Sequence, residues 1–339
     1  MLDMVWDLIG HSWAEKMLQQ HIISGQVRHA YLFTGPGGVG RRSLALQFAM
    51  AINCLQPSSL GIPCGVCRNC IQTQRMQHPD LSIVQAETFG GVLKVEQIRE
   101  LQHQLSLAPY EASYRIALLL RLDEANDNAQ NALLKTLEEP NEKVILLLTA
   151  DLAENLLPTI PSRCEVLRLR PVSGNELAAT LVKRENISPE KAQLIAHVAG
   201  GRPGFAYHLL HEPELLERRQ CWIEDLLTML KANRRQRFAY CESKFYSRID
   251  DRNEIKEKLR EALGHWLSFW RDMLLTTSRA EIPLTNLDFT SQVSQIANQM
   301  NLEMACYLTQ RIESSLPRLS NANLRLLAES LVLEWPHIS

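Results

Sequence analysis

A glycine-rich segment near the N-terminus has the spacing of a phosphate-binding loop but lacks the side chains that act on a nucleotide. Gly35, Gly37 and Gly40 lie between an apolar run and the start of an apolar-periodic helix, and the pattern G-x-x-x-x-G-K-[ST] fits at its two glycines. In that pattern the helix N-terminus holds a phosphate. Arg41, a planar fork rather than a compact charge, stands at the lysine position, and Arg42 replaces the hydroxyl that binds Mg²⁺. The segment predicts a P-loop fold without ATP hydrolysis of its own.

Four cysteines form the second group of residues that could do chemistry. Cys54 is followed by Cys64, Cys67 and Cys70, so that two overlapping C-x-x-C spacings combine with one upstream thiol. Four thiolates suit tetrahedral zinc with Zn–S bonds of about 2.3 Å, and four protein ligands leave no open position for catalysis. We therefore predict a structural Zn²⁺ site. Reactive or merely buried thiols are the alternative, although this combination of spacings is much rarer than a single C-x-x-C.

The elements expected to position these residues alternate between strands and helices. Apolar runs predict buried strands, and apolar side chains every three or four residues predict helices. The expected elements are a helix at 8–27, a strand at 31–33, a helix at 41–53, a strand at 78–85, a helix from 95, a strand at 116–122, a helix from 131 to the proline at 140, and strands at 144–149 and 166–169. This order is typical of a parallel α/β sandwich with layers αβα, in which ligands lie at the carboxyl ends of the strands.

The rest of the chain is expected to be helical. Short helices are predicted at 176–184, 189–198 and 205–210, and longer stretches follow with Leu and Trp at helical spacing. The basic run at 231–237 is interpreted as a solvated face rather than a DNA contact. We expect three domains, an α/β domain at 1–170 with a zinc module at 54–70, a small helical domain at 171–211 and an all-α domain at 212–339.

Composition narrows the classes of function. Of the 339 residues, 45% are hydrophobic and 22% charged, which is ordinary for a globular protein, and the formal net charge is −2. This balance gives no general attraction to nucleic acid or to an anionic membrane, so any DNA contact must come from a local patch or from other subunits. Acidic residues near the start and the lack of an apolar run of about 18 residues argue against a secretory signal and a membrane span. We expect a cytoplasmic protein without membrane contact.

Five groups of residues together carry a resemblance to a known family. They are the loop 35–40, the four cysteines, the tripeptide 78–80, the segment 131–140 and the tetrapeptide 161–164. In order and spacing they resemble the clamp-loader subunits of bacterial DNA polymerase III, an AAA+ family. The resemblance covers the first two of the three expected domains. Among these subunits, the chain is most similar to the member whose P-loop is commonly degraded.

The resemblance implies an architecture and a set of partners. In the family an AAA+ module is followed by a helical lid and by a helical collar that closes a ring of subunits. The implied partners are motor subunits of the tau/gamma type and a delta-type subunit and, through the complex, the sliding clamp and primer–template DNA. ATP would be bound by neighbouring subunits and is not expected to be hydrolysed by this chain.

The resemblance also implies roles for single residues. Arg163 matches the arginine of the family's Ser-Arg-Cys motif, which reaches ATP bound by the next subunit as an arginine finger in trans. An ordinary surface arginine in a salt bridge is the alternative. Thr149 matches the sensor-1 position. Arg202 lies near the position of a lid arginine that senses phosphate, but without a phosphate here we expect it only to pack the lid.

The acidic residues that would hold the metal ion are displaced in the sequence. Counted back from Asn131 at the spacing of active relatives, the acid pair falls at Leu120 and Arg121. Asp123 and Glu124 come three residues too late. If this ungapped register holds, the site lacks both the metal-holding acid and the lysine. A deletion in the intervening loop would restore the pair, so this alternative stays open.

Two further hypotheses compete with a non-hydrolysing clamp-loader subunit. The first is an active motor ATPase of the same family that also carries the four-cysteine site, but a motor should show Lys and then Ser or Thr at positions 41 and 42. The second is a zinc-dependent nucleic-acid-binding protein unconnected to clamps. The net charge and the long helical C-terminal part argue against it.

Overall fold

The chain forms two units, and each buries apolar side chains of its own. The computed structural model describes residue 6 and residues 8–88, 90–247 and 251–338. The first unit consists of residues 1–184 and 201–205, and the second of residues 185–200 and 206–339. The sheet belongs to the first unit.

A sheet of five parallel strands is the centre of the first unit. Its strand order is β2-β3-β4-β1-β5. The strands are β1 (Ala30–Thr34), β2 (Leu81–Val84), β3 (Arg115–Leu119), β4 (Val144–Ala150) and β5 (Glu165–Arg168). Every residue of the three central strands is buried, as expected for a parallel sheet with both faces covered.

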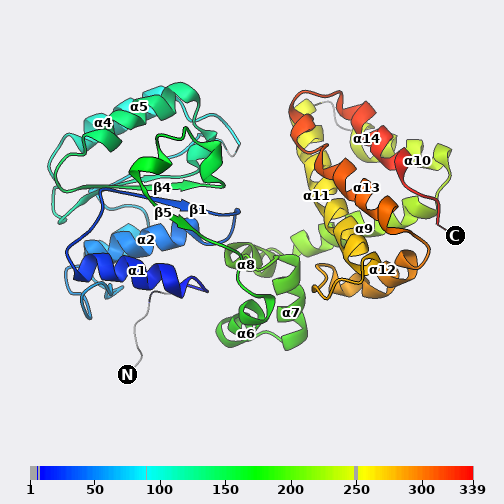
Figure 1. Ribbon diagram of the computed structural model, residues 1–339, viewed down its shortest axis with the longest axis horizontal. Helices are drawn as coiled ribbons and strands as arrows, with labels where there is room; N and C mark the ends of the chain where they lie inside the picture. Colours follow the sequence, from blue (N-terminus) through cyan, green and yellow to red (C-terminus); the bar gives the residue numbers. More distant parts are fainter. Residues whose placement is uncertain (1–5, 7, 89, 248–250, 339) are drawn as a thin grey trace. The chain divides into compact units, whose positions relative to one another are not determined.

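Helices cover both faces of this sheet. In Figure 1, α1 and α2 lie on one face, and α4 and α5 lie on the other. Phe48 of α2 packs with Tyr31 of β1 in one core, and Leu133 of α5 packs with Leu146 of β4 in the other. The helices of this unit are α1 (Ser12–Ile23), α2 (Arg41–Ile52), α3 (Arg68–Gln74), α4 (Val95–Leu105), α5 (Asp127–Glu138) and α6 (Gly174–Glu185). The predicted αβα sandwich is confirmed.

Several element boundaries differ from the prediction for local reasons. The first helix is shorter than the predicted 8–27, since His11 before it has the left-handed φ of 62°. The strand predicted at 116–122 ends at Leu119, because Arg121 also has a left-handed φ, of 52°. Asn126 caps α5 by accepting the N–H of Ala129 at 2.9 Å, so this helix begins four residues before the predicted start.

All the regular secondary structure that is described in the second unit is helical. The helices are α7 (Pro189–Val198), most of α8 (Pro203–His211), α9 (Pro213–Lys231), α10 (Arg234–Cys241), a π-helical turn at Glu242–Tyr246, α11 (Arg252–Thr277), α12 (Thr290–Ala297), α13 (Leu302–Glu313) and α14 (Leu324–Glu334). The long helix α11 is central, with α9, α12 and α13 around it (Figure 1). Trp266 and Trp270 of α11 are fully buried in its core. The Leu and Trp stripes of the sequence therefore pack into a core.

One charged residue of the basic run at 231–237 differs from the expected solvated face. Arg237 is buried and donates hydrogen bonds to the carbonyl oxygens of Met229, Val332, Trp335 and Pro336. These hydrogen bonds of the guanidinium hold the segment after α14 against α10. The local sequence does not show this role, because it depends on carbonyl groups that only the fold brings around Arg237.

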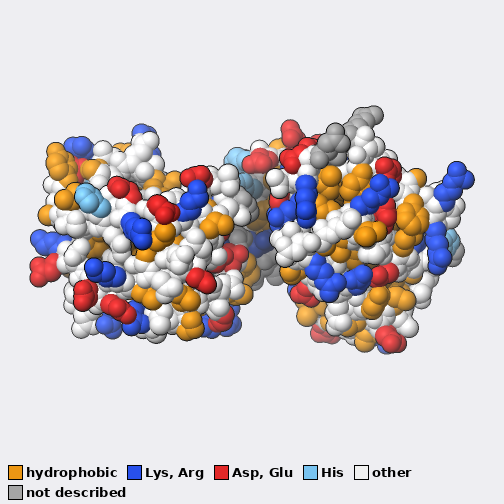
Figure 2. Space-filling view, turned by 90° about the horizontal axis from the view of Figure 1, so that it is seen from above, with side chains coloured by type: hydrophobic (Ala, Val, Ile, Leu, Met, Phe, Trp, Pro, Cys, Tyr) orange, Lys and Arg blue, Asp and Glu red, His pale blue; other side chains and the backbone are white. Residues whose placement is uncertain are grey.

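The surface carries charges of both signs. On the face of the first unit seen in Figure 2, Lys and Arg side chains are interspersed with Asp and Glu. This pattern agrees with the small net charge of −2. Within the part of the chain that the structure describes, every helix is too short or too polar to cross a bilayer.

Candidate functional site

The glycine loop connects β1 to α2, as predicted. Gly35, Gly38 and Gly40 have φ values of +141°, +81° and +112°, which residues with a Cβ atom rarely adopt. A Cβ atom at Gly35 would also lie 2.3 Å from the carbonyl oxygen of Leu169, whereas one at Gly37 would meet open space. The shape of the loop therefore requires three of its glycines even without a phosphate.

Other segments of the first unit contact this loop directly. The N–H of Gly35 donates to the carbonyl oxygen of Asp151 at 3.0 Å, just after β4. The N–H of Gly204, in the first turn of α8, donates to the carbonyl oxygen of Gly38 at 2.8 Å. The loop is thus hydrogen-bonded by the protein at its first glycine and at its middle.

The two arginines that follow the loop have different surroundings. Arg41 places Nη2 2.7 Å from Oδ1 of Asp151, and its side chain is only 10% exposed. Arg42 is exposed to solvent. The position of the phosphate-binding lysine is therefore occupied by a guanidinium that is already paired with a carboxylate.

The segment after β3 places an apolar side chain at the position that the ungapped register assigns to the metal-holding acid. Leu120 is buried among the apolar residues under the sheet. Asp123 lies in the short 3₁₀ turn Leu122–Glu124, and its Oδ1 accepts the N–H of Asp151 at 3.3 Å. Burial, together with the nearby charge of Asp151, raises the pKa of Asp123. Although Asp123 comes three residues late in the sequence, the turn brings it to the end of β4.

Thr149 and Arg202, the two predicted sensor positions, contact protein groups. Thr149 is buried at the end of β4, and its Oγ1 accepts the N–H of Arg121 at 2.9 Å. The Nε of Arg121 in turn lies 2.8 Å from Oε1 of Glu124. The guanidinium carbon of Arg202 lies 4.6 Å from the ring centre of Phe205, and burial lowers the pKa of this arginine. Both side chains thus contact other groups of the protein at their positions.

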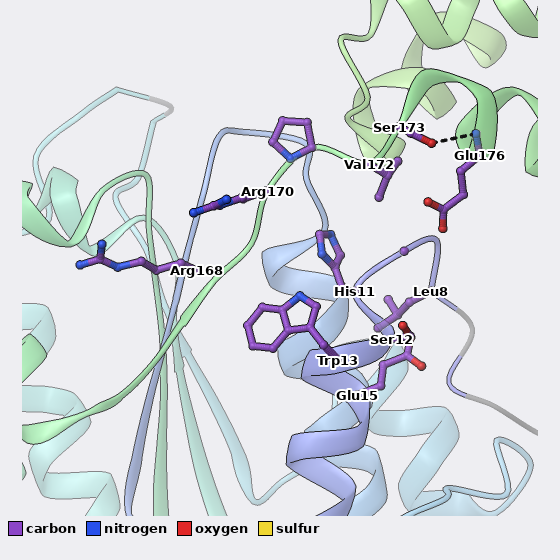
Figure 3. A pocket seen from close by; sticks show the side chains of 12 residues that line it. Leu8, His11, Ser12, Trp13, Glu15, Arg168, Arg170, Val172, Ser173 and Glu176 are labelled. Atoms are coloured by element: carbon purple, nitrogen blue, oxygen red, sulfur yellow. Dashed lines mark hydrogen bonds between the residues drawn. The ribbon is translucent and has the colours of Figure 1, made fainter.

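An open pocket of about 760 Å³ lies next to the glycine loop, lined by the start of α1 and by the chain that leaves β5 (Figure 3). His11 connects the pocket with the glycine loop, since its Nε2 lies 3.0 Å from the carbonyl oxygen of Val39 in that loop. Glu15 also lines the pocket and is only 5% exposed, and burial raises its pKa to about 7. Glu15 is not among the site residues predicted from the sequence. The available signal was its position one turn before the buried Leu18, on the apolar face of α1.

Arg163 lies at the surface of the first unit, at the end of the 3₁₀ turn Pro161–Arg163. Its Nη2 is 2.8 Å from Oε1 of Glu138 in α5, and its Nη1 donates to the carbonyl oxygen of Thr159 at 3.0 Å. The Arg163 side chain is 34% exposed. Its guanidinium is oriented by exposed partners and stays accessible from solvent.

The four predicted zinc ligands lie together between α2 and the end of α3. All four sulfur atoms lie within 4.8 Å of one another. Cys54 Sγ is 3.5 Å from Cys64 Sγ and 4.0 Å from Cys67 Sγ, and Cys64 Sγ is 4.0 Å from Cys70 Sγ. Zn–S bonds of about 2.3 Å in a tetrahedron place sulfurs about 3.8 Å apart. The donor set therefore fits the metal, and zinc would serve there as a structural ion.

Comparison with known proteins identifies the family. The model of the family described as "DNA polymerase III, delta subunit" matches residues 10–173. DNA polymerase III subunit delta′ of Bacillus subtilis is 30% identical over 321 residues, which cover 94% of this chain and 94% of the relative. The chain belongs to the delta-prime family of DNA polymerase III subunits. The delta′ subunit of Pseudomonas aeruginosa is 32% identical over 224 residues, covering 65% of this chain and 67% of that subunit.

A solved structure from the same group of proteins is also similar to this delta-prime family member. A DNA polymerase III gamma subunit-related protein from Thermotoga maritima aligns with a TM-score of 0.47 and 16% identity, covering 94% of this chain and 97% of that protein. The resemblance to clamp-loader subunits, and within them to the delta-prime member, is confirmed by the family match. The predicted parallel α/β fold with a helical C-terminal part is confirmed as well.

Proposed function

We propose that this delta-prime family member is a non-hydrolysing subunit of the DNA polymerase III clamp loader, and that it supports ATP-dependent loading of the sliding clamp. The observation that carries the proposal is the burial of Leu120 in an apolar core, since the ungapped register assigns this position to the metal-holding acid. Together with Arg41 and Arg42, it leaves the site without the three groups that hold Mg²⁺ and the β- and γ-phosphates. Hydrolysis needs the metal and the lysine at the same site.

The second part of the proposal gives Arg163 the role of an arginine finger in trans. A finger must be charged, must present a fork to phosphoryl oxygens and must be reachable from outside its own subunit. The exposure of Arg163 and its position on a short turn meet these requirements. Its pair with Glu138 involves two exposed side chains, and such pairs contribute only about 0–1 kcal/mol, so the guanidinium can be released to a phosphate.

The proposed assembly follows the family. Residues 1–170 would form the AAA+ domain, 171–211 the lid and 212–339 the collar that joins the ring. Its partners would be tau/gamma-type motor subunits and a delta-type subunit, with the sliding clamp and primer–template DNA reached through the complex, in the cytoplasm. Zinc would bind this chain, and ATP would bind the neighbouring subunits.

ATP turnover by the isolated chain tests the first part. We expect none above background, because both the metal-holding acid and the lysine are absent. The double variant Arg41→Lys with Arg42→Thr should remain inactive, whereas adding Leu120→Asp supplies the missing acid. Turnover by the unaltered chain at the rate of the motor subunits, abolished by a substitution at Gly40, would contradict the proposal.

Arg163→Ala in the reconstituted complex tests the second part. The variant should fold and enter the ring, yet slow the DNA-stimulated ATPase by about 10³-fold at the site that it serves, as arginine fingers do elsewhere. Arg163→Lys should restore only part of the rate, because a point charge does not reproduce the fork. Arg75→Ala removes another exposed arginine of the same unit and serves as the control. An unchanged ATPase and unchanged clamp loading with Arg163→Ala would exclude the role.

A further inference from the structure

The end of β4 supplies the glycine loop with an anion of the protein's own. We propose that the carboxylate of Asp151 is the resident anion of this P-loop, pairing with Arg41 in place of phosphate and keeping polyphosphates out. This inference rests on the proposed function, because it explains how a loop without nucleotide keeps its shape. It goes beyond that function because it assigns the exclusion of polyphosphates to the carboxylate of Asp151.

Asp151 contacts both ends of the loop. Its carboxylate lies 2.7 Å from Nη2 of Arg41, which directly follows the last glycine, and its carbonyl oxygen accepts the N–H of Gly35, the first glycine, at 3.0 Å. One residue therefore bridges the start and the end of the loop. In a nucleotide-binding P-loop a bound phosphate performs this bridging.

The charges around the loop oppose a second anion. Asp123 accepts the N–H of Asp151, so that two carboxylates and one guanidinium meet at this point. An entering polyphosphate would have to displace Asp151 from Arg41 while both carboxylates stay close, and like charges at short distance repel strongly in a partly buried site.

Arg41 nevertheless retains capacity to bind an anion. Its side chain is nine-tenths buried, and its Nη1 is buried without a hydrogen-bond partner among the described residues. Asp151 occupies only one arm of the guanidinium, and its own side chain is 55% exposed. Removing the charge of Asp151 should therefore leave Arg41 as an unpaired cation at a helix N-terminus, and such a site attracts anions.

Isothermal titration calorimetry of the full chain with inorganic pyrophosphate tests the inference by measuring the affinity for this anion. Asp151→Asn should bind pyrophosphate at least about tenfold more tightly than the unaltered chain, because a competing charge next to Arg41 is gone. Asp123→Asn should shift the affinity in the same direction by less. Adding Arg41→Gln to Asp151→Asn should abolish the gain. Glu142→Gln, which removes an equal charge from an exposed loop of the same unit, should have no effect.

Two results would overturn the inference. One is equal pyrophosphate affinity of the Asp151→Asn variant and the unaltered chain, and the other is a gain that survives Arg41→Gln. Circular dichroism checks folding, and Asp151→Ser serves as a second variant if the first one fails to fold. ATP turnover measured on the same samples separates the two proposals. Turnover by the unaltered chain contradicts the proposed function, whereas equal affinities contradict only the role of Asp151.

Discussion

The buried carboxyl group of Glu15 makes a quantitative prediction about stability and pH. Burial raises the pKa of this group from its ordinary value of 4.5 to about 7 in the folded chain. Because a folded-state pKa above the unfolded value favours the protonated form, its contribution to stability is complete below pH 4.5. That contribution is lost as the pH rises through about 7. Above this range the folded chain must keep an ionised carboxylate in a poorly solvated place.

The size of the effect follows from the two pKa values. One pKa unit corresponds to about 1.4 kcal/mol, so ionising Glu15 in the fold costs up to about 3 kcal/mol. Glu15→Gln removes the ionisation and keeps the shape. At pH 8 the variant should therefore be more stable than the unaltered chain by up to about 3 kcal/mol, and the difference should fall to about 1 kcal/mol at pH 5 and vanish below pH 4.5.

Urea unfolding of both proteins at several pH values between 5 and 8, with zinc present, measures this difference. Glu176→Gln is the matched control, since Glu176 lines the same pocket but is exposed. It should leave the pH dependence unchanged. If Glu15→Gln and the unaltered chain show the same dependence on pH, the carboxyl group is solvated in the folded chain and the reasoning from burial is wrong.

Three further predictions concern stability. Metal analysis should find one zinc per chain, and a chelator or Cys67→Ser should lower the melting temperature of the first unit without altering the ATPase of the complex. Arg237→Met should destabilise the second unit by about 3 kcal/mol in urea unfolding, because four carbonyl oxygens lose the guanidinium that donates to them, although that of Met229 still accepts the N–H of Ala232. Asp80→Asn should lower the free energy of unfolding by about 2 kcal/mol at pH 7. The variant should also lose less stability than the unaltered chain as the pH falls into the acid range. Burial alone would raise the pKa of Asp80, but three N–H donors and Arg115 lower it.

The sequence allowed the fold of the first unit to be predicted because its signals are local. Buried parallel strands are continuous apolar runs, and the spacing of Cys64, Cys67 and Cys70 brings these thiols together over a short stretch of chain. The site around the loop depends instead on the strand order. Asp151 reaches Arg41 only because β4 pairs with β1, and no local pattern specifies that neighbour.

The missed residues share a physical reason. Glu15 looks like an ordinary solvent-facing acid until the buried face of α1 is known, and Arg237 looks like part of a basic surface. In both cases a charged residue type that is commonly exposed is buried, and only the tertiary neighbours reveal it. The motif residues, in contrast, were recognisable because their spacing is unusual.

The interleaved order of the two units along the chain has a consequence for work with fragments. The chain passes from the first unit to the second after residue 184, returns for residues 201–205, and then leaves again. A fragment that ends at residue 184 would keep all five strands but lose Gly204, whose N–H binds the carbonyl oxygen of Gly38. No single cut separates the units intact. The glycine loop is completed by a segment that comes after α7, so its shape depends on a part of the chain synthesised later than the whole sheet.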